Sequence, residues 1–364
     1  MCGITGFVNH TKDISSYKNV LNNMTDEIIK RGPDETGIYL EKHVALGHRR
    51  LVVIDLENGK QPMQAIHNEN TYTIVYNGQI YNANEIRKDL LSAGFSFDGH
   101  CDTEVLLKAY IHYGSSVLSK VNGIFAFAIW DTNKQELFLA RDHFGIKPLY
   151  YSIVDNTLIF SSEVKSILKH PLVEAKIDNN GLCELFGLGP AHSPGNTVFK
   201  NIYELKPAHF AFFNSSGLHI NKYWELESKV HLDGFSKTCE HIKYLLEDSI
   251  HRQLVSDVPL CTMLSGGLDS SIITKFASDY YKKHNMQLNT YSVDYVDNDK
   301  NFVKSDFQPN SDKHYIDIMI KECDTNHHNI VIDTPELADE LEDAMIARDF
   351  PRYGRCRFFL SSIL

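Results

Sequence analysis

The chain has 364 residues, of which 43% are hydrophobic and 23% charged, and its formal net charge at pH 7 is −11. This is the composition of an ordinary globular protein long enough for two cores, and its acidity argues against nucleic-acid and membrane-surface partners, which require a basic face. No apolar run reaches the roughly 20 residues of a membrane span, and no signal peptide is visible, so we expect a cytoplasmic protein. Seven scattered cysteines without a Cys-x-x-Cys pair suggest neither a disulfide framework nor a zinc site.

The chain opens Met1-Cys2-Gly3-Ile4-Thr5-Gly6, so removal of the initiator methionine would make a cysteine the N-terminal residue. Its thiol would then attack a carbonyl while the freed α-amine, with an ordinary pKa of roughly 7.7 to 8.0, transfers protons near neutral pH. The competing interpretation is that Cys2 is a small apolar residue before a buried strand, predicted from Ile4 to Val8. The motifs that follow favour the first interpretation.

Hydrophobic periodicity predicts the other elements of the first half. Helices are expected at 16–29, 83–93 and 101–113, and strands at 37–40, 44–46, 72–76, 121–130, 135–140, 197–199 and 209–213. Arg49-Arg50 leads into a buried apolar run, where an arginine fork would clamp a carboxylate; a solvated surface pair is the alternative. Asn77-Gly78 indicates either a turn that ends a strand or two donors for an oxyanion, and Asp102 indicates a helix N-cap.

A polar stretch at 224–234 is expected to be a linker between two domains. Beyond it, strands are expected at 259–264, 289–295 and 329–332, and helices at 236–254, 272–281, 312–323 and 334–348. The last helix would have Thr334 as its N-cap and Pro335 at its first position. This alternation predicts a parallel sheet with crossover helices.

The first strand and helix of that half are joined by Ser265-Gly266-Gly267-Leu268-Asp269-Ser270-Ser271. Backbone N–H groups and hydroxyls at the start of a helix make a cradle for phosphate, although a flexible serine-glycine turn is the alternative. The segment lacks the Gly-Lys-Ser/Thr of a Walker A loop. It resembles the pyrophosphate-binding loop of enzymes that split ATP to AMP and pyrophosphate, which implies Mg²⁺ with the nucleotide and Asp269 beside it.

Further motifs are Arg31-Gly32-Pro33-Asp34, His48-Arg49-Arg50-Leu51, Asn77-Gly78-Gln79-Ile80-Tyr81-Asn82 and Asp102-Thr103-Glu104. With them the chain resembles glutamine-hydrolysing asparagine synthetases from Met1 to about Pro351. The resemblance implies a class II glutamine amidotransferase domain at 1–223, an α+β N-terminal-nucleophile hydrolase sandwich with αββα layers. It implies a linker at 224–234 and, at 235–351, an incomplete α/β parallel-sheet ATP-pyrophosphatase domain of the adenine nucleotide α-hydrolase-like kind.

The same resemblance assigns roles. Cys2 would form a thioester with glutamine and release ammonia, with Asn77 and Gly78 as the oxyanion hole. Glutamine would be held by Arg50, Leu51, Val52, Val53, Ile54, Gln79 and Asp102, where Gln79 replaces the usual glutamate and weakens binding. ATP would be held by Leu264, Ser265, Gly266, Gly267, Leu268, Asp269, Ser270, Ser271 and Val293. ATP would activate aspartate as an acyl-adenylate, which ammonia converts to asparagine.

The end of the chain departs from the family, which commonly continues Asp-Phe-Pro with Gly-Met-Ala-Asp-Val-Asp-Ser-Ser. Here Arg352-Tyr353-Gly354-Arg355-Cys356-Arg357-Phe358-Phe359 follows Pro351. A codon string for the family sequence, read one base out of phase, encodes these same residues. We therefore expect 352–364 to be an out-of-frame tail and the synthetase half to be incomplete; a diverged terminus is the alternative.

The leading expectation is glutamine-dependent asparagine synthesis, with glutamine, aspartate and ATP as small-molecule substrates. The alternatives are an uncoupled glutaminase, another class II amidotransferase with an ATP-pyrophosphatase domain, and a non-catalytic fragment. The sequence leaves the oligomeric state open, and a homodimer is among the states it allows.

Overall fold

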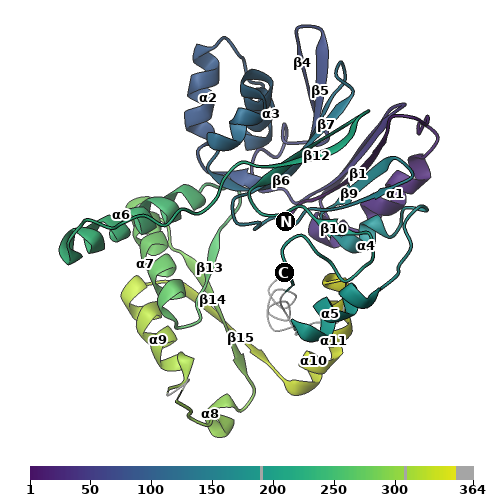
Figure 1. The fold of residues 1–364 in the computed structure, drawn as a ribbon. Coiled ribbons are helices and arrows are strands. Elements are labelled where there is room, and N and C mark those ends of the chain that lie inside the picture. Colours follow the sequence, from purple (N-terminus) through teal and green to yellow (C-terminus); the bar gives the residue numbers. More distant parts are fainter. Residues whose placement is uncertain (189–191, 307–309, 350–364) are drawn as a thin grey trace. The chain divides into compact units, whose positions relative to one another are not determined.

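The computed structural model describes residues 1–188, 192–306 and 310–349. The chain forms two compact units, Met1–Ser228 and the residues from Lys229 onward (Figure 1). Each unit is described by itself, and the tail expected at 352–364 lies outside the described residues. No helix within the described ranges is long and apolar enough to cross a membrane.

The first unit contains two six-stranded sheets, with strand orders β10-β8-β9-β1-β3-β2 and β12-β11-β7-β6-β5-β4. The first sheet consists of β1 (Gly3–Asn9), β2 (Glu35–Leu40), β3 (Val44–Arg50), β8 (Tyr150–Val154), β9 (Thr157–Ser161) and β10 (Tyr203–Glu204). The second consists of β4 (Met63–His67), β5 (Asn70–Ile80), β6 (Gly123–Asp131), β7 (Glu136–Arg141), β11 (His209–Asn214) and β12 (Gly217–Lys222). The helices are α1 (Lys18–Asp26), α2 (Ala83–Ser92), α3 (Asp102–Tyr113), α4 (Val164–Ile167) and α5 (Asn179–Gly187), with 3₁₀ turns at Ile29–Arg31 and Gly114–Ser119.

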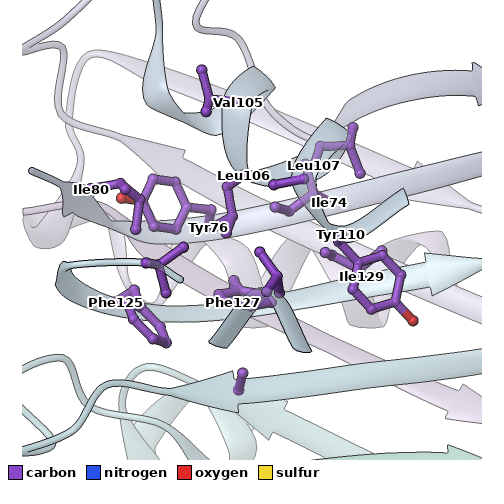
Figure 2. Close-up of a cluster of buried hydrophobic side chains, with 14 of the residues drawn as sticks. Ile74, Tyr76, Ile80, Val105, Leu106, Leu107, Tyr110, Phe125, Phe127 and Ile129 are labelled. Carbon is purple, nitrogen blue, oxygen red and sulfur yellow. The ribbon is translucent and has the colours of Figure 1, made fainter. Parts of the chain in front are cut away.

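Alternation of side chains along the strands divides the core into layers. In β5, Ile74 and Tyr76 pack with α3 in one apolar cluster, while Val75 between them belongs to the cluster shared by the two sheets. Figure 2 shows the first cluster, where Tyr76 and Phe127 lie close to Leu106. A third cluster joins the other sheet to α1 and α4. The α-β-β-α sandwich predicted from the resemblance is therefore confirmed.

The second unit has a three-stranded parallel sheet in the order β13-β14-β15. Its strands are β13 (Cys261–Met263), β14 (Asn289–Tyr295) and β15 (Asn326–Ile332), and its helices are α6 (Phe235–Gln253), α7 (Leu268–Lys283), α8 (Asn298–Asn301), α9 (Asp312–Cys323), α10 (Thr334–Asp339) and α11 (Leu341–Ala347). Helix α7 connects β13 to β14, and α8 and α9 lie between β14 and β15 (Figure 1). The expected parallel sheet with crossover helices is therefore confirmed.

Some local predictions of secondary structure were wrong. The apolar run at 51–54 forms an irregular, half-buried loop, because its backbone follows the guanidinium of Arg50 rather than a neighbouring strand. Residues 197–199 form no strand. The helix expected at 334–348 is two helices, and its N-cap is Asp333, whose carboxylate accepts the Glu336 N–H at 2.9 Å in a capping box.

Candidate active site

One edge of β5 is left open beyond Ile74, because β4 begins at Met63, opposite Ile74, and pairs with β5 only from Asn70 to Ile74. Along an antiparallel strand, the N–H groups of alternate residues point to the same edge. The N–H of Tyr76 donates to Gln61 Oε1 at 2.6 Å, and the N–H of Ile80 donates to Asp102 Oδ2 at 2.9 Å. Gly78 lies between these two residues in the same alternation, so its N–H points to this edge as well.

The strand runs unbroken through Asn77 and Gly78, which pair with Ala126 and Phe125 of β6, so the turn predicted there was wrong. A close approach, rather than a turn, requires the glycine. A Cβ atom at position 78 would lie 2.3 Å from the main-chain oxygen of Ile124. The glycine of the Asn-Gly pair is thus required because the main chain of β6 approaches β5 closely at this position.

A cavity of about 200 Å³ lies against this edge. It is lined by nine of the residues expected to act on glutamine, namely Cys2, Arg50, Leu51, Val53, Ile54, Asn77, Gly78, Gln79 and Asp102. Val52 is not in the lining, and its N–H donates to Asp34 Oδ2 at 2.8 Å. The sequence analysis missed Met1, Gly59, Gln61, Tyr76, Cys101, Thr103, Ile124 and Lys147. The residues expected around glutamine are brought together from the position before β1, the end of β3 and the loop after it, β5 and the start of α3.

Cys2 precedes β1 and is held from two sides. Its Sγ lies 3.4 Å from the N–H of Leu51, and its main-chain oxygen accepts a hydrogen bond from Arg31 Nε at 2.9 Å. Burial raises the pKa of the Cys2 thiol, while the Leu51 N–H acts in the opposite direction. Burial also lowers the pKa of the N-terminal amine, here on Met1, which favours the neutral base.

The side chain of Asn77 carries an unsatisfied donor. Among the described residues, its Nδ2 is buried without a hydrogen-bond partner. A buried unpaired amide costs about 1–3 kcal/mol, so native proteins rarely keep one without a use for it. Next to it lies the N–H of Gly78 at the open edge of β5, and the two donors line the same cavity.

Asp102 is the first residue of α3, whose N-cap is Cys101, so the prediction of an N-cap at Asp102 was wrong. Its carboxylate instead reaches β5, where Oδ2 accepts the Tyr76 hydroxyl at 2.8 Å and the Ile80 N–H at 2.9 Å. Burial raises the pKa of Asp102, and these two hydrogen bonds lower it again. The arrangement holds a carboxylate at the wall of the cavity, suited to an ammonium group.

Arg50 ends β3, and its guanidinium is occupied by the protein. Nη1 donates to Glu35 Oε2 at 2.8 Å and to Leu56 O at 3.2 Å. Nη2 donates to Ile54 O at 3.2 Å and to Asp55 O at 2.5 Å. A carboxylate can therefore bind the fork of Arg50 only by replacing one or more of these contacts.

In the second unit, the segment 265–271 follows β13, but the helix begins earlier than predicted: α7 starts at Leu268, so residues 264–267 form the connection and 268–271 the first turn of α7. Hydroxyl groups of the segment bond within it. Ser265 Oγ and Ser270 Oγ lie 3.1 Å apart, and Ser270 Oγ donates to Gly267 O at 3.1 Å. Gly266 has φ 79°, and a Cβ there would lie 2.8 Å from Asp312 O in α9. The segment therefore lies against the first turn of α9.

A second cavity of about 250 Å³ lies at the carboxyl end of β14 and beside the first half of β15, and Val293 and Asp312 are in its lining. Asp312 thus connects this cavity to the loop at 265–271. Asp269 is exposed in the first turn of α7. No group of three His, Cys, Asp or Glu side chains that could hold a metal occurs among the described residues.

Comparison with known proteins gives two family matches. The model described as "Glutamine amidotransferase domain" matches residues 1–224, and the one described as "Asparagine synthase" matches residues 241–362. The second match runs into the tail expected to be out of frame, which stays a prediction.

Three curated relatives give the extent of the likeness. "Asparagine synthetase [glutamine-hydrolyzing] 3" of Bacillus subtilis is 47% identical over 96% of this chain and 57% of its own. "Putative asparagine synthetase [glutamine-hydrolyzing] 2" of Methanocaldococcus jannaschii is 34% identical over 93% of this chain and 67% of its own. "Amidase chyE" of Penicillium rubens is 32% identical over 96% of this chain and 54% of its own. The chain thus spans about half to two thirds of the length of these relatives, and it belongs to the family of glutamine-hydrolysing asparagine synthetases.

Proposed function

We propose that the first unit hydrolyses glutamine with Cys2 as the nucleophile. The observation that carries this proposal is the unpartnered Asn77 Nδ2 in the same cavity as the Cys2 thiol. Once Met1 is removed, Sγ attacks the side-chain carbonyl carbon of glutamine and the freed α-amine takes the thiol proton. Negative charge then develops on the former carbonyl oxygen, where Asn77 Nδ2 and the Gly78 N–H would receive it.

The remaining steps return the protein to its starting state. The α-amine passes its proton to the amide nitrogen, the carbon–nitrogen bond breaks, and ammonia leaves a thioester on Cys2. Water then adds to the thioester and releases glutamate, with the α-amine again carrying the proton. Asp102 would hold the ammonium of glutamine, and the α-carboxylate would replace protein contacts at Arg50.

We propose that the second unit uses ATP to activate aspartate, with residues 264–271 and Val293 around the nucleotide. Support comes from the loop between β13 and α7. This loop leads into the N-terminus of a long helix, where backbone N–H groups favour the binding of phosphate. Mg²⁺ would enter bound to the phosphates, with Asp269 as a single additional ligand. Ammonia attack on the acyl-adenylate gives asparagine and AMP. We also propose a cytoplasmic location, and a homodimer is the assembly to test.

A second candidate is an amidotransferase with a different acceptor. The observation that favours it is the 32% identity to a protein named as an amidase, over nearly the whole chain. Both candidates share the glutaminase reaction, so they differ only in the compound that consumes ammonia.

The test is a paired assay on purified protein whose N-terminus has been checked by intact mass. Glutamate release from glutamine and AMP formation from ATP with aspartate are measured for the wild type, for Cys2→Ala and for Cys183→Ala, a control at an exposed free cysteine. We expect glutamate release to vanish in Cys2→Ala and to persist in Cys183→Ala. Glutamate release by Cys2→Ala would overturn the assignment, and AMP that requires an acceptor other than aspartate would favour the second candidate.

A further inference from the structure

Lys147 lines the glutamine cavity, although neither the motifs nor the proposed reaction use it. Its side chain is 7% exposed, and its Nζ lies 2.9 Å from the thioether sulfur of Met1. In the described part of the chain, no carboxylate lies within ion-pair distance, 4 Å, of this ammonium. A buried ammonium whose contact is a weak sulfur acceptor is costly, which is typical of a functional group rather than a structural one.

The loop that carries Lys147 is fixed by the carboxylate of Asp142. Its two oxygens accept the N–H groups of Phe125, Phe144, Ile146 and Lys147 at 2.9–3.2 Å. These bonds occupy the nearest carboxylate with backbone donors. They also fix the main chain of Lys147, so the direction of its side chain follows from the loop.

Arg141 fixes the same loop from its other side. Its Nε donates to Lys147 O at 2.8 Å, and its Nη2 donates to Gly145 O at 2.8 Å. Gly145 has φ 67°, and a Cβ there would lie 2.9 Å from Arg141 Cζ, so only glycine allows this arrangement. A network of buried hydrogen bonds therefore holds the loop that places Lys147 in the cavity.

A second cation besides Lys147, the guanidinium of Arg31, lies next to Cys2. Arg31 donates to the main-chain oxygen of Cys2, and its Nη2 is buried without a hydrogen-bond partner among the described residues. The charges of Arg31 and Lys147 are close enough to interact with each other and with the N-terminal amine. The titratable or charged groups that face this site from the surrounding elements are Arg31, Asp34, Arg50, Tyr76, Asp142, Lys147 and Glu163, whose carboxylate pairs with Arg31 at 2.9 Å.

We propose that Lys147 is a positioning residue for the N-terminal nucleophile, acting with Arg31 as a buried cationic pair that keeps the α-amine of the processed chain neutral until Sγ attacks and stabilises the negative charge on Sγ as the thiol proton passes to that amine. Removal of Met1 takes away the thioether and leaves the ammonium beside the new N-terminus. A fixed positive charge stabilises negative charge on Sγ and disfavours a proton on the amine. This role rests on the proposed glutaminase reaction.

The experiment follows the alkylation of Cys2 by iodoacetamide across pH 5–10, read by intact mass and peptide mapping, beside the pH profile of kcat/KM for glutamine. In Lys147→Met we expect both ascending limbs to move up by about one pH unit, a loss of about tenfold on the acidic side, with rates approaching wild type at high pH. Lys147→Arg should restore the wild-type profile. Lys169→Met, at a half-exposed lysine that pairs with Glu27, is the control and should change nothing.

Each result separates the two proposals. A Lys147→Met profile that is lowered evenly without moving, or a Lys147→Arg profile that moves as far as that of Lys147→Met, would overturn the positioning role while leaving the glutaminase intact. If the alkylation profile of Lys147→Met is shifted relative to wild type but the wild type releases no glutamate, the proposed function would be overturned and the role of the cationic pair would stand. If Lys147→Met is insoluble, Lys147→Gln provides the same loss of charge in a polar side chain.

Discussion

Arg31 Nε donates a hydrogen bond to the main-chain oxygen of Cys2 at 2.9 Å, and Arg31 Nη1 pairs with Glu163 Oε1 at 2.9 Å. One guanidinium thus links the residue before β1 to the residue before α4. Both side chains of the ion pair are less than 10% exposed, so the main chain of Cys2 is held by a buried charge pair. The motif Arg-Gly-Pro-Asp therefore contacts Cys2 through its arginine.

Arg31→Met should damage both stability and activity. The substitution removes the arginine partner of the buried Glu163 carboxylate, and breaking a buried pair costs about 3–5 kcal/mol. Chemical denaturation of the variant should show this loss. The double variant Arg31→Met/Glu163→Met should recover part of the stability without recovering kcat, because the hydrogen bond to Cys2 stays absent. Equal stability of the two variants would contradict a charge-pair role.

Asn77→Ala should reduce activity with little effect on stability. Its Nδ2 has no partner to lose, so the free energy of unfolding should change little, while kcat for glutamine should fall by about 10²–10³-fold. Asn70→Ala is the matched control in the same strand. Asn70 Nδ2 donates to Asp131 Oδ1 at 2.8 Å, so this variant should be destabilised while it retains kcat. Similar kcat values for the two variants would contradict the oxyanion role.

Asp102→Asn should stabilise the protein and impair substrate binding. Burial raises the pKa of Asp102 above its unfolded value, so the ionised form is disfavoured in the fold and costs stability at pH 7. This cost disappears as the pH falls through the raised pKa. The gain in melting temperature of Asp102→Asn should therefore be largest near neutral pH and vanish in acid, while KM for glutamine rises about tenfold or more. A uniform melting-temperature gain at every pH would exclude this electrostatic cause.

Nine of the residues that line the cavity at Cys2 were predictable because short motifs carried them. The strand pairing and burial of the residues around them could not be predicted from the sequence. Asn77-Gly78 is typical of a turn, and its place in an unbroken strand depends on pairing with Ala126 and Phe125 of β6, which no local signal in the sequence indicates. Lys147 sits in a Gly-Pro loop, and its burial follows from Asp142 and Arg141 at contacts that sequence spacing does not reveal.

The second unit shows the same limit. The strand β14 and the helix α9 were predicted with their observed bounds, since their apolar periodicity is strong. The predicted N-cap of α10, Thr334, was wrong. Asp333 and Thr334 are both good N-cap residues, and the capping box of Asp333 with Glu336 decides between them. Local propensity predicts the element, and side-chain geometry sets its end.

Gly266 and Gly267 offer a matched pair of alanine substitutions in the loop proposed to hold phosphate. At Gly266, alanine would occupy φ 79° and meet Asp312 O at 2.8 Å, whereas at Gly267, with φ −77°, the nearest atom is Ser265 Oγ at 3.6 Å. Left-handed backbone costs a non-glycine residue about 1–2 kcal/mol, so Gly266→Ala should change the loop and Gly267→Ala should preserve it. Titration calorimetry with ATP should show affinity reduced about tenfold or more for Gly266→Ala and within about twofold of wild type for Gly267→Ala. Equal affinities would mean that the nucleotide does not depend on this loop conformation, and the proposed phosphate cradle would have to be placed elsewhere in the second unit.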